Sequence, residues 1–248
     1  MTPPHEFEMS EDFLHVLKKS TKVVVLTGAG ISAESGIPTF RGKEGLWHNF
    51  RAEELATPEA FNRDPVRVWE WYRWRREKIS SSGPNAAHIA LADMEDLFDD
   101  FTLITQNVDG LHSRAGSRNI LELHGNIWRV RCSAGCGKFE MIEINELPPK
   151  CRCGALLRPD VVWFGESLDQ RVIGKAAEIS AISELFLSVG TSAVVYPAAE
   201  LPIIAKQNGA FLAEINTDET PISNYCDASF RGRAGDVLPA ILSAISSK

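Results

Sequence analysis

The chain has 248 residues, of which 44% are hydrophobic, so it can bury one full core or a core with an inserted lobe. No apolar run approaches the roughly 18 residues of a membrane span, and the N-terminal residues lack the basic and apolar regions of a signal peptide; we expect a cytoplasmic protein. A formal net charge of -7 argues against nucleic-acid binding and suits contact with lysine-rich peptides, although a solvated acidic surface is its commoner meaning.

Four apolar runs, of which the first is rich in β-branched residues, predict buried strands at 22–26, 101–104, 185–189 and 210–215. Longer segments with helical spacing separate them, so we predict an α/β fold with a Rossmann-like, mostly parallel sheet and helices on both faces. Glycine or polar residues follow each run, and such residues line the ligand crevice of open α/β sheets. Ordinary turns would explain each group singly, but less well all four together.

The first predicted strand ends in a glycine turn, Gly28-Ala29-Gly30-Ile31-Ser32-Ala33. This turn matches the G-x-G-x-x-A form of a dinucleotide-binding turn, in which glycines let the main chain turn tightly and approach a pyrophosphate. A glycine pair after a strand also occurs in many other α/β proteins. By itself, this turn leaves nucleotide binding open.

Two segments interrupt the α/β order. Residues 45–84 carry many aromatic residues and few strand signals, so we expect a small helical insert there. Residues 129–157 hold four of the five cysteines and predict a small zinc-binding lobe. The Rossmann-like domain would then comprise residues 1–44, 85–128 and 158–248.

The four clustered cysteines are Cys132, Cys136, Cys151 and Cys153. Four thiolates can close a tetrahedral zinc site, and so short a segment needs a crosslink because it cannot build its own core. Both cysteine pairs depart by one residue from the usual C-x2-C spacing, and two disulfides are the alternative. A zinc ion held by four thiolates has no open position for water, so its role would be structural. Cys226 lies outside the cluster and is expected to be a buried small hydrophobe or an unpaired thiol.

Six ordered blocks, spread over about residues 22–239, resemble the sirtuins, which are NAD-dependent protein lysine deacylases. Besides the glycine turn and the cysteine cluster, they are Thr105–His112 (TQNVDGLH), Leu121–Asn126 (LELHGN), Arg158–Glu166 (RPDVVWFGE) and Val189–Ser192 (VGTS). The resemblance implies that the acyl-lysine amide oxygen displaces nicotinamide from NAD, that a histidine then activates a ribose hydroxyl, and that the acyl group ends on ADP-ribose. NAD is consumed in this chemistry.

His124 is the expected general base, because a histidine with a pKa near neutrality can take a proton from a ribose hydroxyl and the adjacent glycine lets substrate come close. An isolated histidine is more often structural; we expect His48, His88 and His112 to be structural or solvent-facing. The resemblance also implies that Asn107 and Asp109 orient nicotinamide and ribose. It assigns further NAD contacts to the glycine turn, Phe40, Arg41, Gln106, Gly190, Thr191, Ser192, Asn216 and Ala234.

Tyr72 and Arg75 are three residues apart in a predicted helix and would project from one face. A phenol and an arginine fork could bind a carboxylate at the end of an acyl chain. This pair resembles the signature of class III sirtuins, which remove succinyl, malonyl or glutaryl groups. The alternative is an amphipathic helix that buries its tryptophans and exposes Arg73, Arg75 and Arg76 to water.

The segment Val161–Glu166 is expected to capture the acyl-lysine protein substrate as an added strand, with Val161, Trp163 and Phe164 as contacts. Core packing of Val161 and Trp163 is the alternative. Two other functions remain open beside deacylation. One is mono-ADP-ribosyl transfer to a protein side chain, and the other is a non-enzymatic NAD or ADP-ribose sensor that would not need His124.

Overall fold

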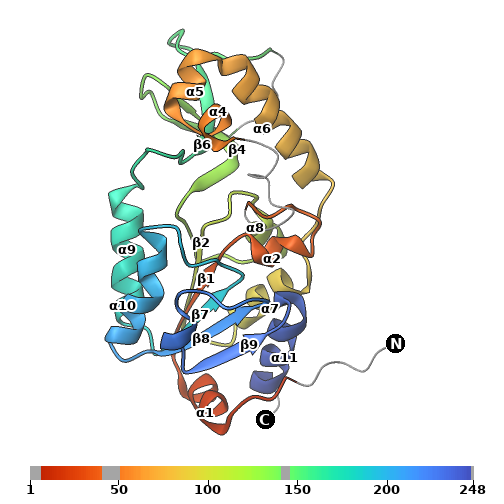
Figure 1. The fold of residues 1–248 in the computed structure, drawn as a ribbon, viewed down its shortest axis with the longest axis vertical. Helices are drawn as coiled ribbons and strands as arrows, with labels where there is room; N and C mark the ends of the chain where they lie inside the picture. The colour runs from red at the N-terminus through yellow and green to blue at the C-terminus, as the bar shows by residue number, and fades with distance from the viewer. Residues whose placement is uncertain (1–6, 41–50, 141–145, 247–248) are drawn as a thin grey trace.

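The structure is a computed structural model that describes residues 7–40, 51–140 and 146–246. Six parallel strands form its main sheet in the order β3-β2-β1-β7-β8-β9 (Figure 1). Their bounds are β1 Lys22–Thr27, β2 Asp100–Thr105, β3 Ile120–Glu122, β7 Leu185–Val189, β8 Phe211–Asn216 and β9 Ala228–Arg231. β1, β2, β7 and β8 confirm the four predicted strands. The sequence does not predict β3 and β9, because such short segments show no clear period.

Helices cover both faces of this sheet, as predicted (Figure 1). α1 (Glu11–Lys19), α7 (Ala86–Met94) and α11 (Ala234–Ser246) pack on one face, and α9 (Gln170–Ala181) and α10 (Leu201–Gln207) pack on the other. The shorter helices are α2 (Gly30–Ala33), α8 (Leu111–Ala115), and the 3-10 turns η1 (Ala198–Glu200) and η2 (Ser223–Tyr225).

The central strand β1 shows why its sequence is apolar throughout. Val23 and Val25 belong to the core beneath α1, α7 and α11, whereas Val24 and Leu26 belong to the core beneath α9 and α10. Successive side chains of a strand point to opposite faces, and here both faces are covered. The strand therefore shows no alternation of polar and apolar residues.

A second part of the molecule combines α4 (Ala52–Leu55), α5 (Pro58–Arg63) and α6 (Pro65–Ser80) with a small antiparallel sheet. That sheet has the order β5-β4-β6, with bounds β4 Gly125–Cys132, β5 Lys138–Glu140 and β6 Leu157–Val161. Side chains of the helices and of β4 and β6 share one hydrophobic core. The division of the chain into three domains stays a prediction. Within the described ranges, no helix has the length and apolar character needed to cross a membrane.

Candidate functional site

A cavity of about 680 Å³ lies at the carboxyl ends of the parallel strands, between the main sheet and α6. Gly28, Gln106, Gly190 and Asn216, which follow or end β1, β2, β7 and β8, all line it. The chain runs from β1 to one side of the sheet and later returns to the other side at β7, so the cavity occupies the topological switch point. The four polar and glycine groups singled out in the sequence are therefore brought together.

The glycine turn after β1 packs directly on the turn after β7. The Gly30 amide donates to the Gly190 carbonyl oxygen at 2.8 Å, and the Gly28 amide donates to the Val189 carbonyl oxygen at 3.0 Å. A Cβ at residue 30 would lie 2.7 Å from that Gly190 oxygen, and Gly190 itself has a left-handed φ of 57°. Glycine is thus required here for the contact between two turns, whatever ligand they bind.

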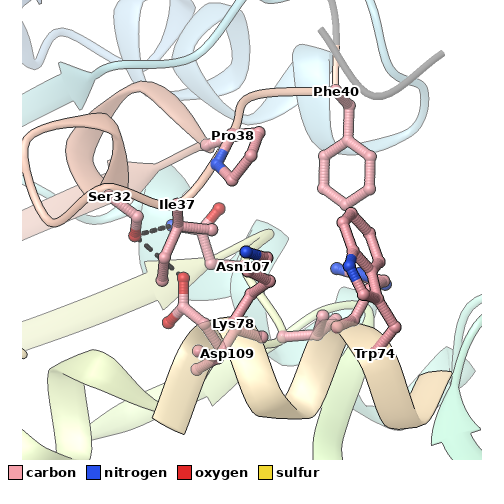
Figure 2. Close-up of a pocket in the computed structure, with 12 residues that line it drawn as sticks. Ser32, Ile37, Pro38, Phe40, Trp74, Lys78, Asn107 and Asp109 are labelled. Atoms are coloured by element: carbon pink, nitrogen blue, oxygen red, sulfur yellow. Dashed lines mark hydrogen bonds between the residues drawn. The ribbon is translucent and has the colours of Figure 1, made fainter. Parts of the chain in front are cut away.

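Ser32, Asn107 and Asp109 form a buried hydrogen-bond network beside the cavity (Figure 2). The Ser32 hydroxyl donates to Asp109 Oδ2 at 2.8 Å, and Asn107 Nδ2 donates to the Gly28 carbonyl oxygen at 3.0 Å and to Ser32 Oγ at 3.2 Å. Burial raises the pKa of Asp109, while hydrogen bonds from the Leu111 amide and Ser32 oppose that shift. The network fixes both side chains that were expected to orient nicotinamide and ribose.

These three residues line a small pocket of about 30 Å³, enough for a water-sized group. Phe40 and Trp74 face one another on its other side (Figure 2). Phe40 and Asn107 also line the large cavity, so the pocket is a side chamber of it. Arg41, expected beside Phe40, lies outside the described residues.

His124 is half-buried and lines the large cavity. Its Nδ1 lies 2.9 Å from the Gln106 carbonyl oxygen, which can only accept, so the Nδ1–H group donates and the Nε2 lone pair remains. Burial lowers the pKa of His124, and the hydrogen bond to Gln106 partly opposes this shift. The ring is thus held neutral, with one basic nitrogen, at neutral pH.

Two other histidines are buried away from the cavity lining. His112 Nε2 lies 3.0 Å from Thr27 Oγ1, and the rings of His88 and His112 are 4.8 Å apart. Burial lowers the pKa of His88 to about 4 and that of His112 to about 3. The expectation that these histidines are structural or solvent-facing is met in its structural form, because both are buried. His48 lies outside the described residues.

Tyr72 and Arg75 lie side by side on α6 and line the cavity. They are 1% and 7% exposed, so the idea that Arg75 points into solvent is wrong. The Arg75 guanidinium carbon is 5.1, 4.9 and 5.6 Å from the ring centroids of Phe40, Trp71 and Tyr72. No carboxylate among the described residues forms an ion pair with it, and burial lowers its pKa.

Arg76 is also buried, and it makes a structural contact to β4. Its Nε donates to the Ile127 carbonyl oxygen at 2.7 Å, and burial lowers its pKa to about 10. Arg73 alone of the three arginines is exposed. The helix therefore uses Arg75 toward the cavity, Arg76 toward β4 and Arg73 toward solvent.

The segment after β6 contributes Val161, Trp163 and Phe164 to the cavity wall. Val161 and Trp163 are buried, while Phe164 is 47% exposed. The Val162 amide donates to the His124 carbonyl oxygen, and the Phe164 amide donates to the Ala56 carbonyl oxygen. Because these two amides are engaged, an added substrate strand would have to use other main-chain groups of the segment. Its strand-like capture of a peptide stays a prediction.

The remaining expected NAD contacts divide into two groups. Thr191 connects the turns, because it accepts from Gln106 Nε2 through its hydroxyl and from Asn216 Nδ2 through its carbonyl. Together with Ala29, Gly190 and Ser192, these residues line the cavity. Ala33 is exposed and Ala234 packs in the core, and neither lines the cavity or its side chamber.

Several lining residues were not predicted. Trp71 lies one helical turn before Arg75, a spacing that was readable from the helix pattern. Thr217 and Asp218 belong to the polar group that follows the fourth predicted strand, whereas Thr39, Ala56, Val195, Tyr196, Glu219 and Thr220 have no local signal. They belong to loops whose approach to the cavity depends on the folded chain.

The sulfur atoms of Cys132, Cys136, Cys151 and Cys153 all lie within 4.8 Å of one another. In tetrahedral zinc–thiolate sites the sulfur atoms are about 3.8 Å apart, and here Cys132 and Cys153 are at 3.6 Å. The thiols are free rather than paired in disulfides, so the geometry fits one structural zinc ion. Cys226 lies apart, half-buried, and burial raises its pKa to about 12.

Comparison with known proteins identifies the family of this chain. The Sir2 family model matches residues 28–197. The chain belongs to the Sir2 family. The NAD-dependent protein deacylase of Aquifex aeolicus is 55% identical over 93% of this chain and 98% of its own length. NAD-dependent protein deacylase 1 of Archaeoglobus fulgidus is 52% identical, over 94% of this chain and 97% of its own.

Solved Sir2 structures share the fold. A Sir2 homolog–NAD complex is 50% identical, with a TM-score of 0.90 over 98% of this chain and 96% of that one. A Sir2–p53 peptide–NAD+ complex is 32% identical, with a TM-score of 0.85 over 97% of this chain and the whole of that one. Family membership and fold therefore confirm the resemblance read from the six sequence blocks.

Proposed function

We propose that this Sir2 family member is an NAD-dependent protein lysine deacylase that releases nicotinamide and transfers the acyl group to ADP-ribose. Relatives about half identical to it are named for NAD-dependent protein deacylation. The observation that carries the proposal is the single basic nitrogen of His124 at the cavity wall. NAD, bound as a co-substrate, would supply the electrophilic ribose carbon.

Different residues of the cavity would bind different parts of NAD and carry out the proton transfer. The turns at Gly30 and Gly190 would hold the phosphates, and Asn107 with Asp109 would orient the nicotinamide end by hydrogen bonds. His124 Nε2 would take the proton from a ribose hydroxyl, since a neutral imidazole can accept a proton at the working pH. The zinc ion would stabilise the small sheet and take no part in the reaction.

We further propose that the acyl group preferred by this enzyme carries a carboxylate. Arg75 is a buried cation on the cavity wall, and the described residues give it aromatic neighbours but no carboxylate partner. A buried cation without a carboxylate in direct contact is costly, so a ligand carboxylate that reaches it gains a strong, charge-assisted interaction. Tyr72 stands next to it with a hydroxyl that can donate.

The experiment compares NAD-dependent deacylation of matched acetyl-lysine and succinyl-lysine peptides by the native enzyme and by Arg75→Met. We expect the native enzyme to prefer the succinyl peptide and Arg75→Met to lose about 10- to 100-fold of that preference, because one or two charged hydrogen bonds disappear. Arg73→Met, on the exposed side of the same helix, is the matched control and should keep the preference.

Other outcomes separate the alternatives. Acetyl removal without any effect of Arg75 would leave the deacylase proposal and reject the carboxylate site. No deacylation, with labelled ADP-ribose on an acceptor protein, would favour ADP-ribosyl transfer, and NAD binding without turnover would favour a sensor. The cytoplasmic location and the absence of nucleic-acid partners stay predictions; cell fractionation and a binding assay with DNA and RNA would test them.

A further inference from the structure

The indole of Trp163 and the phenol of Tyr72 meet across two distant parts of the chain. Trp163 Nε1–H donates to the Tyr72 hydroxyl oxygen at 2.9 Å, over a sequence separation of 91 residues. The two side chains are 2% and 1% exposed, and both residues line the large cavity. Trp163, expected from the sequence as a peptide contact or a core residue, therefore also contacts one of the two expected acyl-binding residues.

This hydrogen bond has a fixed direction. An indole N–H can only donate, whereas a phenol has one O–H to donate and two lone pairs to accept with. Arg75, the polar neighbour of Tyr72 on α6, is also a donor only. The described residues form no hydrogen bond that accepts the Tyr72 proton, and the burial that raises the pKa of Tyr72 keeps that proton in place.

Arg158 and Glu166 fix the position of Trp163. The Arg158 guanidinium carbon lies 3.2 Å from the centroid of the Trp163 ring. Glu166 binds Arg158 through both of its oxygens, at 2.5 and 2.9 Å, and accepts from the Trp163 main-chain amide at 2.9 Å. Arg131 also donates to Glu166, so four hydrogen bonds engage this carboxylate, and none among the described residues comes from the Tyr72 hydroxyl.

We infer that Trp163 is a positioning residue for acyl recognition: by occupying a lone pair of the Tyr72 hydroxyl, it directs the phenol proton into the cavity, toward a carboxylate oxygen of the acyl chain beside Arg75. The inference rests on the proposed acidic-acyl deacylase function. In this arrangement the phenol donates one hydrogen bond to the acyl carboxylate and Arg75 donates others. The neutral methyl of an acetyl group would use neither donor.

The test is Trp163→Phe, which keeps an aromatic ring but removes the indole donor. The quantity measured is the ratio of kcat/KM for succinyl-lysine to that for acetyl-lysine peptide. We expect this ratio to fall roughly three- to tenfold, the worth of one weakened hydrogen bond. Trp69→Phe is the matched control, because its indole N–H donates to the Leu157 carbonyl oxygen and not to Tyr72; the ratio should stay unchanged.

A double-mutant cycle with Tyr72→Phe decides whether Trp163 acts through the phenol. If it does, Trp163→Phe should lower the ratio in the native background and leave it unchanged in Tyr72→Phe. An equal drop in both backgrounds would mean that Trp163 acts through packing, and no drop in the native background would mean that its donor is not used. Both results overturn the inference while leaving the Arg75 site standing.

A native enzyme with no succinyl preference would overturn both the inference and the acidic-acyl proposal. A succinyl preference that does not depend on the Trp163 donor would overturn the inference alone. If Trp163→Phe does not fold, 3-benzothienylalanine at position 163 replaces the indole N–H by sulfur at almost unchanged size. The same fall in the ratio is expected for that substitution, and an unchanged ratio overturns the inference.

Discussion

His124 donates a hydrogen bond from Nδ1 to the main-chain carbonyl oxygen of Gln106, at 2.9 Å. Gln106 follows β2, and its own side chain reaches Thr191 after β7. The proposed general base is thus oriented by the main chain of the turn after β2, and the Gln106 side chain connects that turn to the turn after β7. This hydrogen bond selects one tautomer and orients the basic nitrogen, and no carboxylate of the described residues is bonded to the ring.

Replacement of His124 by tyrosine should lower deacylation by about 100-fold or more, the usual worth of a general base. NAD binding should persist, because the glycine turns and the Asn107 network do not depend on the His124 side chain. Turnover assays and calorimetric titration with NAD measure the two properties. Unchanged turnover would show that His124 is not the base.

The acid limb of activity should lie below the ordinary histidine value of 6.5, because burial lowers the pKa of His124 and a general base works in its deprotonated form. Activity should therefore persist at mildly acidic pH and fall as the pH drops through this lowered pKa. A profile of kcat/KM against pH measures the position of that limb. An acid limb above 6.5 would contradict the burial argument.

Gly30→Ala should destabilise the protein by about 1–3 kcal/mol, because its Cβ would lie 2.7 Å from the Gly190 carbonyl oxygen and the two turns would have to separate. The free energy of unfolding in urea measures this effect. Gly174→Ala is the control: it lies within α9 and its Cβ would meet no atom within 4 Å. That change should stabilise by roughly 0.5–1 kcal/mol, and equal effects of both would contradict the steric explanation.

The free energy of unfolding should fall in acid, because His88 and His112 are buried in their neutral form. Their pKa values in the folded state, about 4 for His88 and about 3 for His112, lie below the unfolded value of 6.5, so the unfolded chain binds more protons between these limits. The stabilisation is complete above pH 6.5 and is lost as the pH falls toward 4 and below, by an amount on the order of a few kcal/mol.

Urea unfolding of the native protein and of His112→Gln at about pH 7.5 and about pH 5 tests this linkage. The variant should lose less stability between the two conditions than the native protein. His15→Gln, at an exposed position on α1, should behave like the native protein. A native-like acid loss in His112→Gln would show that this histidine does not carry the effect.

Zinc removal should lower the melting temperature and the activity together, because the four-cysteine cluster connects β4 to the loop before β6, and both strands share a hydrophobic core with α6. The catalytic residues lie outside the cluster, so restored zinc should restore activity. Chelation followed by a thermal melt and an activity assay, with metal added back, gives the result. Full activity without metal would contradict a structural role.

Local patterns were sufficient for much of this protein. The apolar runs of β1, β2, β7 and β8, the polar groups that follow them, and the cysteine spacing are properties of short segments, and the structure confirms each of them. The family resemblance rested on those same segments. A strand covered on both faces, or a cluster of thiols, needs no distant information to be recognised.

Other features existed only once the chain was folded. Gly30 packs on Gly190, and Trp163 donates to Tyr72 over 91 residues, yet neither contact leaves a periodic trace in the sequence. The burial of Arg75 and the engagement of Glu166 likewise depend on which segments meet at the cavity. Periodicity records the face that a residue presents, whereas the partner that it meets is set by the packing of elements far apart in the chain.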